Sequence, residues 1–477
     1  MQPLRFNNRF ILRISFISAL GGYLFGFDFA VISGALPFLK QQFSFDPYWE
    51  GLATGILAIG AILGCILAGS IADKYGRRPG LMLAASLFAI SSLAMAFAPN
   101  RDFFLVARFA AGAGVGMASM LSPMYISEMA PAAIRGRLVA MNQLTIVLGI
   151  LITNLINYAL RNTGTDAWRL MFGLGVFPSG LFLAGAYFLP ESPRWLIRNN
   201  KEQAAEMILG KMGDAAYVGE SLSMFKKVMT SAVKVNYAAV FKRAVLPALL
   251  TGIGLAMFQQ FCGINTVFNY APKIFQSIGA SKEDQLLQTV FIGVINLVFT
   301  ILAMALVDKL GRKPLMLIGA GGLCVLYILI VNALHSGSGM LSGLLLAAIG
   351  TYAMTLAPVI WVLISEIFPV AVRTAAITIA IISLWLAYFI LVFTFPIIFE
   401  RLKENTFYIY AAICAAGFLF ALLRIKETKG KDLEEVEQVV FNALITITNE
   451  AAFINTDSLH TNAHWFIING TNCKIAG

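Results

Sequence analysis

The sequence predicts an all-α integral membrane protein with twelve transmembrane helices in two pseudo-symmetric six-helix halves. The first supporting observation is the composition: 58% of the 477 residues are hydrophobic and 13% are charged, whereas about 45–50% of residues are apolar in soluble domains. The second is a series of apolar runs of about the 20 residues that cross a bilayer. The third is a pair of motifs that occurs once in each half of the chain.

The apolar runs give the predicted spans in order along the chain. They cover residues 11–36, 51–72, 80–98, 103–125, 138–160, 168–189, 244–270, 285–307, 314–334, 342–364, 375–399 and 406–423. The first run follows a short basic segment, contains a charged residue and several glycines, and has no Ala-x-Ala-like cleavage site. We therefore interpret it as a retained helix rather than a signal peptide.

Lysine and arginine residues indicate which loops face the cytoplasm, where they are enriched. They gather on alternate loops, at 5–9, 74–78, 135–137, 191–243 and 309–313, whereas the few cations of the opposite loops lie beside acids. Both termini and the central loop are therefore predicted to be cytoplasmic, in a multi-pass protein of the inner cell membrane. This bias also accounts for the formal net charge of +10, so the charge does not imply a nucleic-acid partner.

Cysteine and histidine residues give no indication of a metal site or a cofactor. Four of the five cysteines lie in predicted spans, where they behave as small apolar residues, and the fifth is in the tail. The three histidines lie outside the predicted membrane core. We therefore expect no disulfide framework, no metal cluster and no histidine proton relay.

Two motifs repeat at nearly the same offset along the chain. Asp73-Lys-Tyr-Gly-Arg-Arg-Pro79 after the second span corresponds to Asp308-Lys-Leu-Gly-Arg-Lys-Pro314 after the eighth. Ser127-Glu-Met-Ala-Pro-Ala-Ala-Ile-Arg135 after the fourth span corresponds to Ser365-Glu-Ile-Phe-Pro-Val-Ala-Val-Arg373 after the tenth. Both motifs lie on the same predicted side of the membrane. The chain is therefore expected to contain two parallel six-helix repeats, an arrangement that places a transport site between the halves near the midplane.

This repeat divides the chain into four predicted segments. Residues 1–190 form the first six-helix bundle, 191–243 a cytoplasmic helical linker, 244–424 the second bundle, and 425–477 a cytoplasmic tail without an assigned function. The linker is the one long polar insertion, and residues 201–210 within it have the apolar spacing of a helix.

Charged residues in and near the repeated motifs are candidates for a cytoplasmic gate. Acids and cations at this mouth can pair in one state of the protein and separate in the other; alternatively, the cations only set the topology. The predicted gate residues are Asp73, Arg77, Arg78, Glu128, Arg135, Glu191, Arg194, Asp308, Arg312, Glu366 and Arg373.

The motifs together resemble the sugar porter family of the major facilitator superfamily. Those that carry the resemblance are Phe25-Gly-Phe-Asp28, Pro123-Met-Tyr-Ile-Ser-Glu128, Pro190-Glu-Ser-Pro-Arg-Trp195, Phe258-Gln-Gln-Phe-Cys-Gly-Ile-Asn265 and Ile425-Lys-Glu-Thr-Lys-Gly430. The resemblance covers residues 10–438, and within the family it is greatest to bacterial D-xylose–proton symporters. It implies a transporter that works by alternating access, without catalytic residues or cofactors.

Asp28 is the only carboxylate placed deep within a predicted span, where an aspartate costs about 2.5–3.5 kcal/mol. Arg108 is its natural partner, because the helical rise places Asp28 about 12 Å and Arg108 on the order of 7 Å below the outer surface. Pairing favours a charged acid and burial disfavours it, so a pair that separates can take up and release a proton. The resemblance implies this coupling role for both residues. The alternative is a permanent structural ion pair.

A neutral sugar requires groups that donate and accept hydrogen bonds, together with apolar faces for its C–H surfaces. Amides and tryptophans within the spans supply both, although a single membrane amide is more often an interhelical contact. The sugar-binding residues that the resemblance implies are Gln143, Gln259, Gln260, Asn265, Asn296, Trp361 and Trp385.

Some positions depart from the family pattern. Leu384 and Tyr388 stand where the eleventh span often carries amides. No carboxylate lies near Gly175, where the xylose symporters carry a further acid, so coupling would depend on Asp28 alone. The identity of the sugar therefore stays open.

Taken together, these features predict a proton-coupled importer of a D-xylose-like pentose or hexose. It would act as a monomer in the lipid bilayer, with the sugar and the proton as its partners. A facilitative uniporter of the same fold is one alternative. A non-transporting sugar sensor is another, but the short and unpatterned tail offers no signalling domain. An enzyme is not expected, because the spans contain no constellation of nucleophile, base and metal ligands.

Overall fold

The computed structural model describes residues 6–131, 134–230, 240–242, 245–368, 372–425 and 427. Its regular elements are helices, apart from an isolated bridge between Phe6 and Gly213. In chain order the elements are α1 (Asn8–Phe43), α2 (Pro47–Tyr75), α3 (Arg77–Ala96), α4 (Arg101–Met129), α5 (Arg135–Ala159), α6 (Ala167–Gly173), α7 (Val176–Tyr187), α8 (Pro193–Arg198), α9 (Glu202–Met212), α10 (Ala215–Thr230), α12 (Leu246–Phe261), α13 (Ile264–Gln276), α14 (Lys282–Leu310), α15 (Arg312–Ser336), α16 (Leu341–Met354), α17 (Leu356–Glu366), α18 (Arg373–Leu402), η1 (Lys403–Asn405) and α19 (Thr406–Arg424).

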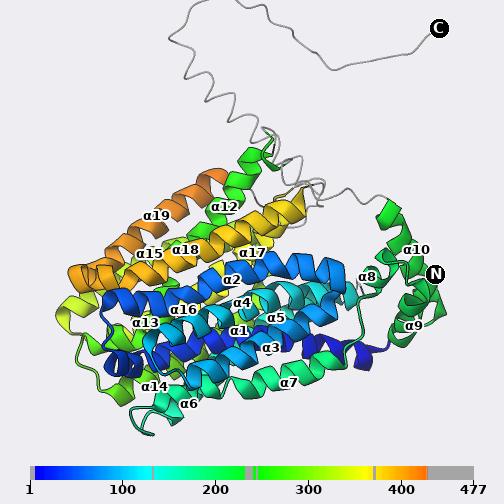
Figure 1. Cartoon of the computed structure of the whole chain (residues 1–477). Coiled ribbons are helices and arrows are strands. Elements are labelled where there is room, and N and C mark those ends of the chain that lie inside the picture. The colour runs from blue at the N-terminus through cyan, green and yellow to red at the C-terminus, as the bar shows by residue number, and fades with distance from the viewer. Residues whose placement is uncertain are drawn as a thin grey trace, which may run out of the picture.

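The long helices lie side by side in one elongated bundle, with α8, α9 and α10 at one end (Figure 1). Eleven stretches of the described chain are long and apolar enough to cross a membrane, and the last, Ala375–Arg424, contains both α18 and α19. Counting α18 and α19 separately gives twelve spans. The predicted number of transmembrane helices is therefore confirmed.

Three spans are broken, although the sequence analysis treated each as a single apolar run. The sixth divides into α6 and α7, the seventh into α12 and α13, and the tenth into α16 and α17 at Thr355. At the break in the seventh span, Gly263 has a φ of 87°, and a Cβ there would lie 2.4 Å from Cγ of Tyr410. Only glycine fits this position, because it lacks a Cβ and readily adopts positive φ.

The internal repeat is visible in how two helices begin. Gly76 precedes α3 and Gly311 precedes α15, both with positive φ and without a side-chain cap of their own. The carboxylate of Glu191 instead accepts hydrogen bonds from the first two backbone N–H groups of α3, at 2.8 and 3.2 Å. Glu427 does the same for α15, at 3.0 and 3.1 Å. Each acid therefore supplies the missing cap and complements the positive end of the helix dipole.

The three short helices α8, α9 and α10 pack against one another and against the start of the chain. The backbone N–H of Asn7 donates to the carbonyl of Met212 at 2.8 Å, and the rings of Phe6 and Tyr217 lie 5.3 Å apart. Trp195 in α8 donates from its indole N–H to the carbonyl of Asp73 at the end of α2. We call this end of the bundle the linker end, and the opposite end the far end.

The two halves contact each other through α2 with α18, and through α5 with α14. Small residues permit the close approach, as in many membrane helix pairs. A Cβ on Gly51 of α2 would lie 2.2 Å from the carbonyl oxygen of Phe393 in α18, and one on Gly293 of α14 would lie 3.0 Å from Cα of Leu151 in α5. The interface between the halves is therefore tightly packed on both sides of the bundle.

Candidate functional site

Asp28 and Arg108 meet in the interior of the first half. Asp28 lies on α1 and Arg108 on α4, and Nη1 of Arg108 is 3.4 Å from Oδ1 of Asp28. Both side chains are 1% exposed. The contact inferred from the depths of the two residues is therefore present, whereas its role in coupling stays a prediction.

Arg108 has other contacts besides Asp28. Its Nε donates to the carbonyl of Ala53 in α2 at 2.6 Å, and its guanidinium lies 5.6 Å from the centre of the Phe172 ring. Asp28 is less well satisfied, because its Oδ2 is buried without a hydrogen-bond partner. The arginine thus has a second anchor that would remain if the aspartate moved away.

Four of the five predicted sugar-binding amides are buried in the second half. Asn265 in α13 donates from its side-chain amide to the Gln260 side-chain oxygen in α12. Gln259 donates to the carbonyl of Ala357 in α17 at 3.3 Å. Asn296 in α14 is also buried, at 6% exposure. We call Gln259, Gln260, Asn265 and Asn296 the amide group.

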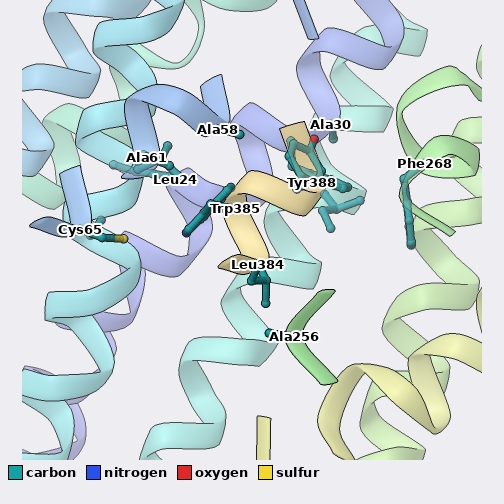
Figure 2. Packing of buried hydrophobic residues seen from close by; sticks show 14 of the residues in the cluster. Leu24, Ala30, Ala58, Ala61, Cys65, Ala256, Phe268, Leu384, Trp385 and Tyr388 are labelled. Carbon is teal, nitrogen blue, oxygen red and sulfur yellow. The ribbon is translucent and has the colours of Figure 1, made fainter. Parts of the chain in front are cut away.

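Aromatic rings connect the two halves beside Asp28. Phe25 lies 5.6 Å from Trp385, and Phe29 lies 5.8 Å from both Tyr388 and Phe268, measured between ring centroids. The close-up of this region shows Trp385 and Tyr388 side by side on α18, with Phe268 on the neighbouring helix (Figure 2). The helix that carries the buried acid is thus in direct contact with two elements of the candidate sugar site.

Two predicted sugar residues stand apart in this state. Gln143 on α5 is half-buried, and Trp361 on α17 is 43% exposed. Within the described part of the chain, neither forms a hydrogen bond or a ring contact with the amide group or with Trp385. Gln260 and Asn265 are in direct contact, Gln259, Asn296 and Trp385 are buried, and Gln143 and Trp361 are more exposed, so a common sugar site for the seven stays a prediction.

The gate residues of the first half form a connected network at the linker end. Nε and Nη2 of Arg77 donate to the two carboxylate oxygens of Glu128 at 2.9 Å each. Asp73 lies 3.7 Å from Arg77 and 3.1 Å from Arg198. Arg78 donates from its side chain to the carbonyl of Tyr187. These contacts tie α2, α3, α4 and α8 together.

Burial perturbs two of the charges in this network. Desolvation raises the pKa of the Glu191 carboxyl, although the backbone N–H groups that it binds act in the opposite direction. Desolvation lowers the pKa of Arg194, the nearby Glu128 opposes this, and the cations Arg135 and Arg77 lower it further. Arg194 in α8 lies 5.1 Å from the Phe225 ring of α10, so it connects two of the linker helices.

The gate residues of the second half are only partly described. The side chains of Asp308 and Glu366 lie outside the described residues. Arg312 contributes its backbone N–H to Glu427, and Arg373 donates from Nε to the carbonyl of Phe368 at 3.1 Å. In the first half, Arg135 likewise donates to the carbonyl of Ala130, at 3.4 Å.

A second buried carboxylate was missed by the sequence analysis. Glu50, in the first turn of α2 at the far end, is 1% exposed and lies 2.6 Å from Nζ of Lys40. It also forms an ion pair with Lys273 of α13, in the other half. Also at the far end, Arg161 forms a 2.6 Å ion pair with Glu283 across the halves. No local signal in the sequence predicts contacts between positions so far apart in the chain. The capping role of Glu427 could have been predicted, because Glu427 follows Glu191 by about one repeat length.

Comparisons with known proteins agree with this architecture. The family model described as "Sugar (and other) transporter" matches residues 14–440. The D-xylose-proton symporter of Escherichia coli (strain K12) is 38% identical over 475 residues, covering 91% of this chain and 96% of the relative. The arabinose-proton symporter of Bacillus subtilis (strain 168) is 37% identical over 440 residues, covering 90% of this chain and 95% of the relative.

Solved structures give the same result. The inward open conformation of the xylose transporter XylE from E. coli superimposes with a TM-score of 0.80 at 36% identity, covering 90% of this chain and 99% of the other. A match of this extent, together with the twelve spans and the repeated motifs, leaves one assignment. The chain belongs to the sugar porter family of the major facilitator superfamily.

Proposed function

We propose that this protein imports a neutral monosaccharide together with a proton by alternating access. The observation that carries the proposal is the buried Asp28–Arg108 pair. Phe25 and Phe29, on the same helix as Asp28, contact Trp385 and Tyr388 of the candidate sugar site. The named activities of the two curated relatives, which are proton symporters of pentoses, support it.

In the proposed mechanism, Asp28 exchanges a proton between two arrangements. Ionised, it pairs with Arg108; protonated, it is neutral and can leave the arginine, which keeps its bond to the carbonyl of Ala53. The neighbouring Phe25 and Phe29 would move with Asp28 and change their contacts with α18 and α13. Sugar and proton are coupled if the bundle changes state readily only when both are bound or both are absent.

Ion pairs join the two halves at the far end, including Glu50 with Lys273 and Arg161 with Glu283, and we propose that they close this end in the described state. We propose that the linker end, with α8–α10, faces the cytoplasm, because it carries most of the loop cations, and that both termini are cytoplasmic. The state would then be closed to the outside. We further propose that the ion pairs of Arg77 and its neighbours rearrange when the linker end closes, and that the two bundles, 1–190 and 244–424, move relative to each other.

Uptake in right-side-out membrane vesicles tests this function. With an inward proton gradient, labelled pentose should accumulate above its external concentration, and a protonophore should abolish the accumulation but not the equilibration. If the protonophore leaves accumulation unchanged, proton symport is wrong. If sugar equilibrates but never accumulates, the protein is a uniporter.

Replacement of Glu50 by glutamine is expected to favour opening of the far end. The variant loses the charged contacts with Lys40 and Lys273, and charge-assisted hydrogen bonds contribute about 1.5–3 kcal/mol each. The population with an open far end should therefore rise roughly tenfold or more. Spin labels at the exposed residues Gln41 and Gln276, near the far ends of α1 and α13, would measure the change as a longer distance.

A matched control removes an acid that pairs within one helix. Asp102 forms a 3.0 Å ion pair with Arg101, and both lie on α4. Asp102→Asn should leave the distance between the labels unchanged. If the distribution of distances between the labels is the same in Glu50→Gln as in the unmodified protein, the ion pairs of Glu50 with Lys40 and Lys273 have no gating role.

A further inference from the structure

The walls of the proposed sugar site differ in their chemistry. Helices α12, α13 and α14 contribute the amide group, whose side chains both donate and accept hydrogen bonds. Helix α18 contributes Leu384, Trp385 and Tyr388, which are 6%, 5% and 3% exposed. In Figure 2 these three side chains occupy one stretch of α18, and Leu384 is directed toward Ala256 of α12. The site thus has a polar wall and a largely apolar wall.

The one hydroxyl of the α18 wall is already used. The side-chain nitrogen of Asn269 donates to the hydroxyl of Tyr388 at 3.1 Å and to the carbonyl of Asn265 at 2.7 Å, and the Tyr388 hydroxyl donates to Oδ1 of Asn269 at 3.4 Å. Asn269 is 0% exposed. Apart from the indole N–H of Trp385, residues 384–388 then offer no free side-chain donor for a hydrogen bond to a ligand.

The ring of Tyr388 is also fixed in place. It lies 5.8 Å from the ring of Phe29 and 5.9 Å from that of Trp385, with contacts on two sides. A side chain held by two rings and a buried hydrogen bond cannot turn its hydroxyl toward a ligand without breaking those contacts. The α18 wall is therefore expected to keep its apolar character when a sugar enters.

The edge of the sugar that faces this wall should lack a hydroxyl. In an aldopyranose, carbons 1 to 4 all carry oxygen, so only carbon 5 can present a purely apolar group. That group is hydrogen in a pentopyranose and methyl in a 6-deoxyhexose, whereas an ordinary hexose presents a hydroxymethyl group. A hydroxyl placed against Leu384 and the ring of Tyr388 loses its water without gaining a partner there, which costs about 10- to 100-fold in recognition.

We propose that Leu384 and Tyr388 make this site selective for monosaccharides that lack the hydroxyl on carbon 6, namely pentopyranoses and 6-deoxyhexoses. The proposal rests on the proposed function, because it assumes that the amide group and α18 enclose the sugar. It assigns carbon 5 to the α18 wall and the ring hydroxyls to the amide group.

Two matched sugar series test the selectivity. D-xylose, 6-deoxy-D-glucose and D-glucose differ only in the group on carbon 5, and L-arabinose, D-fucose and D-galactose form the equivalent series. Counterflow of the labelled pentose of each series into proteoliposomes with the full-length protein would be measured against each unlabelled competitor. We expect the pentose and the 6-deoxyhexose of at least one series to compete about tenfold or more better than the hexose.

Leu384→Gln supplies an amide to the apolar wall. It should raise competition by the hexose relative to its 6-deoxy analogue by about tenfold. The control is Leu386→Gln, the same substitution on the exposed side of α18, where Leu386 is 47% exposed; it should leave the ratio unchanged. Tyr388→Phe separates the ring from the hydroxyl and should keep the preference for the 6-deoxy sugar, because the wall stays apolar.

The outcomes separate this inference from the proposed function. If hexose and 6-deoxyhexose compete equally in the unmodified protein, or if Leu384→Gln and Leu386→Gln change the ratio alike, the selectivity proposal is wrong while transport stands. If none of the sugars exchanges, transport of monosaccharides is itself wrong and this inference is overturned with it. Selectivity that persists without any effect of the proton gradient would support the inference and reject only symport.

Discussion

Asp28→Asn is expected to abolish uphill accumulation of sugar and to preserve exchange. Asparagine has nearly the same shape as aspartate, but it cannot bind and release a proton near neutral pH. One charge moved through a membrane potential gains about 2.3 kcal/mol per 100 mV, which corresponds to roughly fifty-fold accumulation. The variant should lose this entire factor, because Asp28 is the only acid that contacts Arg108 among the described residues.

Two measurements on the same membranes are needed. Uptake driven by a proton gradient should fall to simple equilibration, whereas counterflow of labelled sugar against unlabelled sugar should continue. Asp102→Asn is a suitable control, because Asp102 is a far-end acid with 76% exposure that pairs with Arg101 of the same helix rather than with Arg108. If Asp28→Asn still concentrates sugar, the coupling mechanism proposed here is incorrect, although the twelve-helix transporter would remain.

The fold could be predicted from the sequence because its signals are local or periodic. A span is a run of apolar residues, and the duplication is visible as two motifs that recur at nearly the same offset. The contact between Asp28 and Arg108 was also accessible, since the fixed rise of a helix places each residue at a known depth. The depth of a residue in the membrane can thus be predicted from its position within a span.

Contacts between the halves were not accessible in the same way. Glu50 and Lys273 lie at similar depth, but so do other charged residues of the far end, and only the three-dimensional arrangement selects the pair. The break at Gly263 likewise depends on the ring of Tyr410, which lies far away in the chain. The candidate sugar-site residues were predicted from family motifs. A motif does not predict exposure in a given state, in which Trp361 is 43% exposed while Trp385 is buried.

Arg108→Met is expected to destabilise the protein strongly. Methionine removes the cation and leaves the carboxylate of Asp28 buried without its partner. Breaking a buried ion pair from one side typically costs about 3–5 kcal/mol, and here the hydrogen bond from Nε to the carbonyl of Ala53 is lost as well. Thermal unfolding of the purified protein in detergent would measure the loss as a lower unfolding temperature. Arg137→Met, at an exposed position of α5, should change it little.

The double variant Asp28→Asn/Arg108→Met shows which part of this cost belongs to the unpaired acid. If the cost comes mainly from a buried charge without a partner, neutralising Asp28 should restore much of the stability that Arg108→Met loses, so the two effects will not add. If the double variant is as unstable as Arg108→Met, the arginine acts chiefly through Ala53 and the Phe172 ring. In that case Arg108 would be a structural brace between α2 and α4, and the proton switch would need another partner for Asp28.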